Sequence, residues 1–147
     1  MKKKEMSGAL GALKTIKMSK IDDKDLRNAI IKDHFKLLGE NKKYEEAIDN
    51  LRTAHLGALA DEQKKVNELR EELRTVTKAE RAGEILKEIR EYQGYLDAEA
   101  DFIKDFNELA DEEVEITPID SEKFLDEIQK QDFDLGLIEA IYPMFNL

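Results

Sequence analysis

Cysteine and tryptophan are absent from this 147-residue chain, and proline occurs only twice. Without cysteine there is no disulfide, no thiolate metal ligand and no thiol nucleophile, which is consistent with a reducing cytoplasm. Only seven glycines occur, and aromatic residues make up 7% of the chain. No run of about eighteen apolar residues occurs, so we expect no membrane-spanning helix and no membrane partner.

The first residues also lack the pattern of a secretory signal. The chain begins with three lysines, but Ser7 and Lys14 interrupt the apolar residues that follow. A secretory signal needs a continuous apolar centre. We therefore expect an intracellular protein of the cytoplasm.

Charge is abundant and unevenly distributed. Charged residues make up 39% of the chain, and the net charge is −10. Residues 1–43 carry a net charge of +6, whereas residues 97–127 carry −11. We predict that the basic N-terminal segment pairs with the acidic C-terminal one. The acidic segment also argues against nucleic acid as a partner, because it would repel phosphates.

The stretch from Thr77 to Ala110 has the strongest periodicity in the chain. Its inward positions recur at alternating steps of three and four residues, which predicts one amphipathic helix. Thr77 and Glu80 match a capping box, which predicts that the helix begins at Thr77. The predicted inward residues are Ala82, Ile85, Ile89, Tyr92, Leu96, Glu99, Ile103, Phe106 and Ala110, with Leu86, Phe102 and Leu109 widening the stripe.

A second long helix is predicted from about Asp22, its expected N-cap, to about Arg74. Its apolar phase continues past two glycines, Gly39 and Gly57. The helix is expected to bend at one of them, or alternatively to end at Gly39. The connection to Thr77 is so short that the two helices must form an antiparallel hairpin.

Shorter helices are expected at both ends of the chain. Residues 3–17 predict an N-terminal helix whose inward face holds Met6, Leu10 and Leu13, with residues 1–4 frayed because lysines oppose the helix dipole. An extended segment at Val114 and Ile116 is followed by two short helices. Ser121 is expected to cap the first, which turns Phe124, Leu125 and Ile128 inward, and Asp132 or Asp134 is expected to cap the second, which contains Leu135, Leu137, Ile138 and Ile141.

These elements predict an all-α fold in a single domain, residues 1–147. Residues 1–20 form the N-terminal helix, residues 21–110 a long antiparallel helical hairpin, and residues 111–147 a C-terminal subdomain of one or two short helices that pack back on the hairpin.

No pattern in the sequence points to catalysis or to a metal. His34 and His55 lack the Glu-x-x-His spacing of helical metal sites, and no phosphate-binding loop or nucleophile motif occurs. We expect a protein that is not an enzyme and that has no catalytic residue, metal or cofactor. His55 falls in the inward phase with Glu62, and Glu99 is expected opposite. Such a pair would either fix the helix register or act as a ligand or pH switch.

The segment from Asn107 to Leu125 carries an acidic, leucine-bearing pattern at Glu108, Leu109, Glu113, Val114, Glu115, Ile116, Ile119 and Leu125. Together with the order of the preceding helices, this pattern resembles an uncharacterised family of small helical proteins encoded by tailed bacteriophages and prophages. The resemblance covers the chain in outline and this segment in detail. It implies phage or prophage origin, and hence the cytoplasm of a bacterial host, but no mechanism.

Two kinds of function fit these observations. The first is a protein-binding or assembly module, with a homodimer as one form, because the apolar stripe is wider than one neighbouring helix covers. A structural component of a phage particle is a variant of it. The second is an acidic inhibitor that mimics nucleic-acid charge and binds a basic protein. Tyr92 and Tyr95 cannot both point fully inward, so one of them is a candidate for a partner surface. The predicted surface combines Tyr95 with the acidic residues Asp97, Asp101, Asp105, Glu112 and Glu115.

Overall fold

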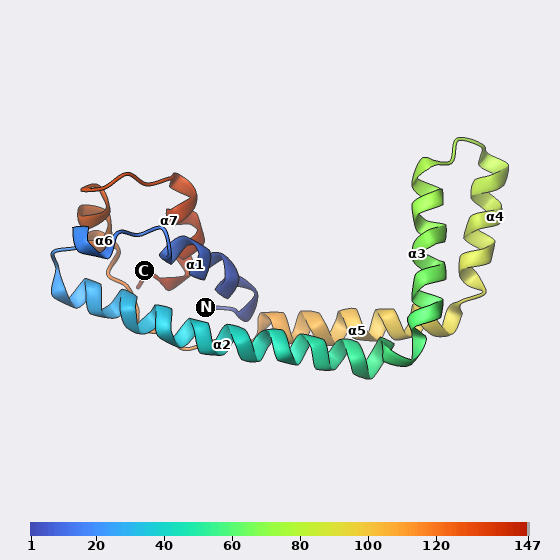
Figure 1. The fold of residues 1–147 in the computed structure, drawn as a ribbon, viewed down its shortest axis with the longest axis horizontal. Helices are drawn as coiled ribbons and strands as arrows, with labels where there is room; N and C mark the ends of the chain where they lie inside the picture. Colours follow the sequence, from blue (N-terminus) through green and yellow to red (C-terminus); the bar gives the residue numbers. More distant parts are fainter. Residues whose placement is uncertain (147) are drawn as a thin grey trace. The chain divides into compact units, whose positions relative to one another are not determined.

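A computed structural model describes residues 1–146, and all regular secondary structure in that range is helical (Figure 1). The all-α prediction is therefore confirmed for the described residues. The seven α-helices are α1 (Met6–Leu13), α2 (Lys24–Leu56), α3 (Ala60–Thr75), α4 (Ala79–Arg90), α5 (Gln93–Asp111), α6 (Ser121–Ile128) and α7 (Leu135–Ile141). Short 3-10 turns occur at Lys3–Glu5, Met18–Lys20, Gly57–Leu59 and Tyr142–Met144.

The chain divides into two compact units. The first unit combines Met1–Glu46 with the segment that begins at Leu109, and the second comprises Ala47–Glu108. Helices α2 and α5 each contribute to both units. That the whole chain behaves as one domain stays a prediction.

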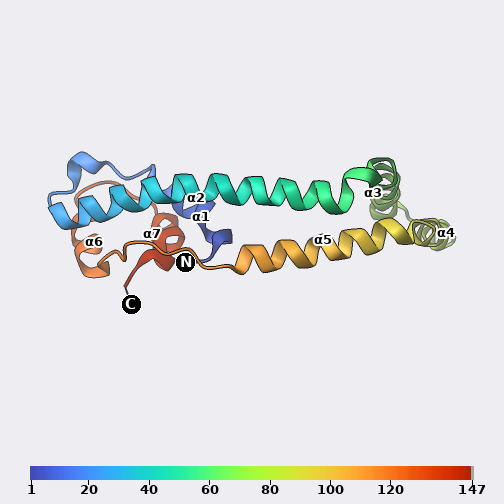
Figure 2. The ribbon, with the colours of Figure 1, turned by 90° about the horizontal axis from the view of Figure 1, so that it is seen from below.

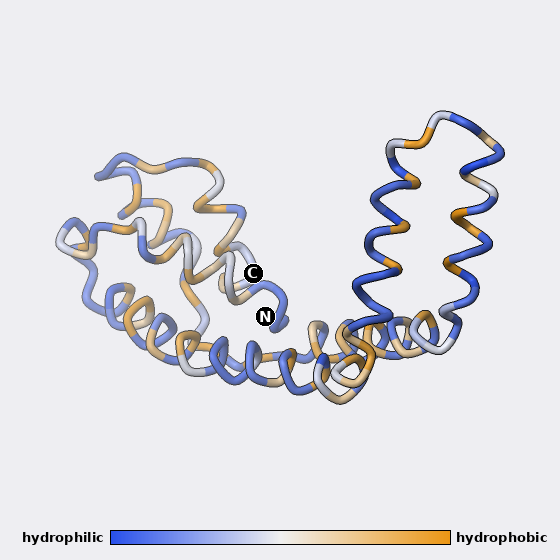
Figure 3. The backbone as a smooth tube through the Cα atoms, turned by 45° about the vertical axis from the view of Figure 1, so that its right-hand side comes forward, coloured by the Kyte–Doolittle hydropathy of each residue, from blue (hydrophilic) through white to orange (hydrophobic). Residues whose placement is uncertain are grey.

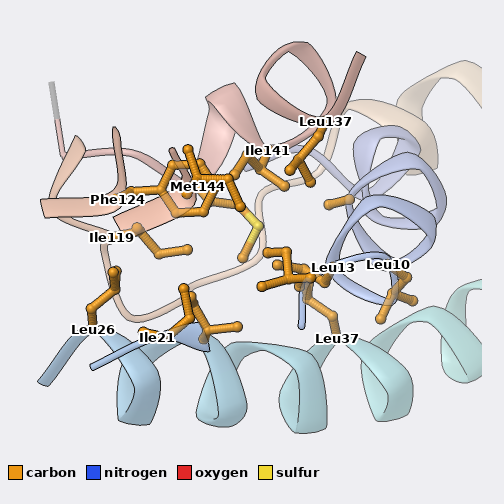
Figure 4. Packing of buried hydrophobic residues seen from close by; sticks show 14 of the residues in the cluster. Leu10, Leu13, Ile21, Leu26, Leu37, Ile119, Phe124, Leu137, Ile141 and Met144 are labelled. Atoms are coloured by element: carbon orange, nitrogen blue, oxygen red, sulfur yellow. The ribbon is translucent and has the colours of Figure 1, made fainter. Parts of the chain in front are cut away.

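The core of the first unit lies between α1, the N-terminal part of α2, and the two C-terminal helices (Figure 4). Helix α1 packs against α7, and the predicted inward face of the N-terminal helix is confirmed. Leu125, which we predicted to be inward, is exposed. Phe124 and Ile128 lie one turn apart and take the buried face of α6, so their neighbour Leu125 points to a different side. The buried core residues include Met6, Leu10, Leu13, Leu26, Ile30, Leu37, Ile119, Phe124, Ile128 and Ile141.

Three of the predicted helix caps shift by one residue. Helix α2 begins at Lys24, and Asp23 rather than Asp22 accepts a hydrogen bond from the backbone N–H of Leu26 at 2.9 Å. Helix α6 is capped by Asp120 rather than Ser121. Helix α4 begins at Ala79 behind Lys78, which makes no side-chain cap, so the predicted capping box at Thr77 is wrong. The cap of α7 is Asp134, one of the two predicted candidates.

The N-terminus is not frayed, contrary to prediction. The backbone N–H of Val114 donates to the carbonyl of Met1 at 2.8 Å, and the backbone N–H of Lys3 donates to Glu112 at 2.9 Å. These bonds tie the first residues to the extended segment after α5. The Lys4 ammonium binds Asp111 at 2.8 Å. The predicted pairing of the basic N-terminus with the acidic segment is therefore confirmed.

The second unit contains the closed end of the hairpin. Helices α3 and α4 run antiparallel and lie side by side (Figures 1 and 2), and their apolar positions recur along the facing sides (Figure 3). The Arg81 guanidinium of α4 holds α3 through two bonds to Glu72, at 2.7 and 3.0 Å. Arg81 also reaches Glu84 and Glu88 on its own helix. These bonds hold the first turn of α4 against α3, and the side chain of Thr77 takes no part in them.

Both legs of the hairpin are interrupted in the second unit. The 3-10 turn Gly57–Leu59 separates α2 from α3, which confirms a bend at Gly57, whereas Gly39 lies inside α2. The helix predicted from Thr77 to Ala110 is instead broken at Glu91–Tyr92 into α4 and α5. The two breaks surround one cluster of buried residues, in which Leu56, Val66 and Tyr95 meet.

The break before α5 also changes which of its residues point inward. Tyr95 is buried and Phe102 is packed against the same cluster, whereas Ile103 is exposed. A helix that restarts at Gln93 no longer keeps the phase set by α4. The predicted inward position of Ile103 is therefore wrong, and this shift explains it.

Candidate functional site

An apolar face of α2 remains uncovered in the first unit. Ile31, Phe35 and Leu38 are 51%, 80% and 47% exposed. Their spacing of four and three residues places them on one face of the helix. Ile30 and Leu37, on a neighbouring face, are buried in the core. Helix α2 is therefore apolar over a wider arc than its own unit covers. We call Ile31, Phe35 and Leu38 the α2 patch.

The α2 patch forms one wall of a groove of about 460 Å³. The other wall comes from the end of α1 and the residues after it, Leu13, Ile16 and Met18. Ile16 is held there because the chain turns back after α1, with its backbone N–H donating to the carbonyl of Leu13 at 3.2 Å. His34 and Lys14 also line the groove. The groove is thus an apolar trough with a basic rim.

Basic side chains continue the same face of α2 beyond the α2 patch. Lys24 lies seven residues before Ile31, and Lys42 lies four residues after Leu38, both at spacings that keep them on that side. Neither these lysines nor Lys14 forms an ion pair with any of residues 1–146. The apolar α2 patch is therefore flanked by lysines whose positive charge forms no ion pair within residues 1–146.

Tyr95, one of the predicted surface residues, is only 2% exposed. Its hydroxyl donates to Glu99 at 2.8 Å, and Glu99 accepts two bonds from Arg70 of α3 at 2.9 and 2.7 Å. Burial is the main reason that the pKa of Tyr95 rises to about 12, and the Glu99 carboxylate adds to it. Tyr95 therefore joins α3 to α5 rather than meeting a partner. Tyr92 is the less buried of the two tyrosines.

The predicted acidic residues are divided between the two units. Asp97, Asp101 and Asp105 lie on α5 in the second unit, whereas Glu112 and Glu115 follow α5 in the first. Asp105 binds His55, and Glu112 pairs with Lys3. Asp97 accepts a hydrogen bond from Gln93 at 2.8 Å. Asp101 and Glu115 are exposed. Several of the carboxylates predicted to meet a partner thus bind other residues of the same chain.

His55 finds a different partner from those predicted. Its Nε2 lies 2.7 Å from Asp105 Oδ2, whereas Glu99 binds Arg70. The ring of His55 meets Phe102 edge-on at 6.5 Å between centroids. No group of three or more acidic or histidine side chains that could hold a metal occurs among the described residues. The His55–Asp105 contact links α2 to α5 and sets their register.

Asp33 is a polar residue that the periodicity analysis missed. It lies in the core face of α2 and is 1% exposed. Its Oδ1 accepts the backbone N–H of Thr117 at 2.7 Å, and its Oδ2 has no hydrogen-bond partner among the described residues. Burial raises the pKa of Asp33 to about 6, although the Thr117 bond and the nearby Lys36 act in the opposite direction. Asp33 thus holds the extended segment against α2.

Among residues 1–146, no helix has both the length and the apolar character needed to span a bilayer. No protein-family model matches this chain, and comparison with curated proteins and with solved structures finds no match. The geometry of the chain itself points to the α2 patch and its groove as the candidate site.

Proposed function

We propose that this protein is a non-catalytic protein-binding or assembly module, of phage or prophage type, that docks a partner on the α2 patch. The exposure of Phe35 carries the proposal. A phenylalanine that is 80% exposed, between two more apolar side chains on the same face, forms a contiguous apolar patch. Burying a side chain of this size is worth about 1.5–3 kcal/mol, and contiguous patches of this kind mark interaction sites.

The shape of the groove favours a protein as the partner. It is open and apolar and runs along a helix, which is the geometry in which an amphipathic helix docks by side chains one turn apart. The basic rim selects for a partner with acidic side chains at the edges of its apolar face. The proposed partner surface is therefore on the basic part of the chain, whereas the sequence suggested acidic residues.

Site-specific photo-cross-linking tests the proposal. A benzophenone amino acid replaces Phe35, or replaces Leu86 of α4 as the control, because Leu86 is likewise an exposed apolar residue on a helix but lies outside the α2 patch. In the cells that naturally make the protein, position 35 should give discrete cross-linked protein adducts that position 86 does not. The absence of adducts at position 35, or the same adducts at both positions, would refute a docking site on α2.

A further inference from the structure

A second exposed apolar surface occurs in the first unit, at the start and end of α7. Leu135 is 72% exposed and Tyr142 is 58% exposed. They lie seven residues apart with Glu139 between them, so all three share one side of the helix and its continuation. Phe133, just before α7, is also partly exposed, but it lines a different hollow with Gly136, Leu137 and Ala140. We call Leu135 and Tyr142 the C-terminal patch.

The charges around the C-terminal patch are opposite to those around the α2 patch. Asp132, Asp134 and Glu139 are exposed, and none of them forms an ion pair with the described residues. Elsewhere in the same unit, opposite charges find one another, as Lys4 and Asp111 do. The carboxylates around α7 and the lysines around α2 are thus two complementary sets that one copy leaves apart.

We infer that the partner on the α2 patch is the C-terminal patch of a second copy of this chain. Apolar side chains of the two patches cover each other, and lysines beside Phe35 face carboxylates beside Leu135. This inference rests on the proposed function and names its partner. Because the two patches differ, the contact is heterologous: each copy offers one patch of each kind.

The size of the patches sets the expected strength. The α2 patch contributes three large apolar side chains and the C-terminal patch two, fewer than the roughly 20 residues a side of a standard stable interface. The ion pairs at the rim are exposed, so each adds little to the affinity. Self-association is therefore expected in the micromolar range or weaker, and added salt should weaken it further.

Sedimentation velocity over a range of protein concentrations tests the inference with three matched variants. Phe35→Gln removes the α2 patch, Leu135→Gln removes the C-terminal patch, and Leu86→Gln is the control at an exposed leucine outside both patches. All three side chains are at least partly exposed, and circular dichroism checks that the helices are retained. The wild type and Leu86→Gln should gain mass as concentration rises, whereas Phe35→Gln and Leu135→Gln should each stay monomeric.

Mixing the two monomeric variants gives the decisive measurement. The Phe35→Gln copy keeps its C-terminal patch, and the Leu135→Gln copy keeps its α2 patch. An equimolar mixture should therefore form a heterodimer, although neither variant associates alone. If Leu135→Gln associates as the wild type does, or if the mixture stays monomeric, the pairing of the two patches is refuted.

A strictly monomeric wild type would also overturn the inference, but it would leave the proposed function intact. In that case cross-linking at position 35 decides the proposed function separately, because adducts to other proteins would show a docking site occupied by a different partner. Failure of both experiments would remove the α2 patch as an interaction site altogether.

Discussion

At the scale of single residues, Asp33 is the position where the core departs most from an apolar helix face. A buried carboxylate with one unpaired oxygen is costly unless it takes up a proton. In return, the Oδ1 atom satisfies the backbone N–H of Thr117 in a segment that has no strand partner there. We interpret Asp33 as a residue that fixes the position of the extended segment and lowers the stability of the fold at neutral pH.

Replacing Asp33 by asparagine should change how stability depends on pH. The pKa of Asp33 is about 6 in the folded protein, above its ordinary value of 3.8, so the folded state binds this proton more tightly than the unfolded state does. The wild type therefore loses stability from this group as pH rises from about 4 through 6. Asparagine keeps an oxygen for Thr117 without a charge, so Asp33→Asn should be more stable than the wild type at pH 7, by on the order of 2 kcal/mol.

Urea unfolding at a series of pH values measures this difference. The advantage of Asp33→Asn should shrink steadily as the pH falls from 7 to below 3.8, where the wild-type carboxyl becomes protonated in both states. Asp101→Asn, an exposed position on α5, should follow the wild type throughout. A difference between Asp33→Asn and the wild type that is constant over this range would show that the carboxyl does not titrate in the folded state.

At the scale of secondary-structure elements, Gly39 lies in the interior of α2 without an apparent structural need. No glycine among the described residues has a positive φ, and a Cβ added at Gly39 would meet nothing within 4 Å. Gly39→Ala should therefore stabilise the protein by about 0.5–1 kcal/mol, because alanine loses less backbone entropy when the helix forms.

Gly136 provides the contrasting substitution. A Cβ at Gly136 would lie 3.1 Å from Oδ1 of Asp134, the atom that accepts the backbone N–H of Gly136 at 2.7 Å and caps α7. Thermal unfolding should show a higher Tm for Gly39→Ala and no gain for Gly136→Ala. Equal gains would mean that the capping geometry at α7 imposes no constraint, and a loss at Gly39 would mean that α2 needs its flexibility.

The elements also show how far periodicity predicts this fold. Apolar residues at helical spacing correctly indicated α1, the long helical run that begins at α2, the antiparallel hairpin and the two C-terminal helices. The break at Glu91–Tyr92 was missed because neither residue disfavours a helix. It arises where Tyr95 packs against Leu56 and Val66, residues about 30 to 40 positions away in sequence. Tertiary packing, not local propensity, ends α4.

The candidate site was only partly predictable, for a related reason. Periodicity identified Ile31, Phe35 and Leu38 as apolar residues of α2, but it could not tell a covered face from an uncovered one. That distinction depends on where α1 and the C-terminal helices pack, which is decided by contacts far apart in sequence. Charge counting likewise identified the acidic segment, but it could not show that some of its carboxylates pair within the chain. The partners of Asp105 and Glu112 lie 50 and 109 residues away in sequence.

At the scale of the whole molecule, the uneven charge is partly resolved within the chain. The acidic end of α5 and the lysines of the N-terminus neutralise each other in the first unit, where Asp111 receives both Lys2 and Lys4. The hydrogen bond from Lys4 is the main reason that the pKa of Asp111 falls below its ordinary value. Unpaired positive charge beside the α2 patch and unpaired negative charge around α7 are the sets that the proposed self-association would bring together.

This division of charge predicts different responses at two aspartates. Asp111→Asn should lower Tm slightly at neutral pH and low salt, because two lysines lose their carboxylate. The loss should vanish in high salt, which screens exposed pairs. It should also vanish at acidic pH, since a carboxyl with a lowered folded pKa contributes stability only above its unfolded pKa and loses that contribution as pH falls. Asp101→Asn, which removes the same charge from a residue without an ion pair to the described part of the chain, should leave Tm unchanged under all three conditions. Equal effects of the two substitutions would mean that net charge, and not the pairing of the N-terminus with α5, governs the stability of the first unit.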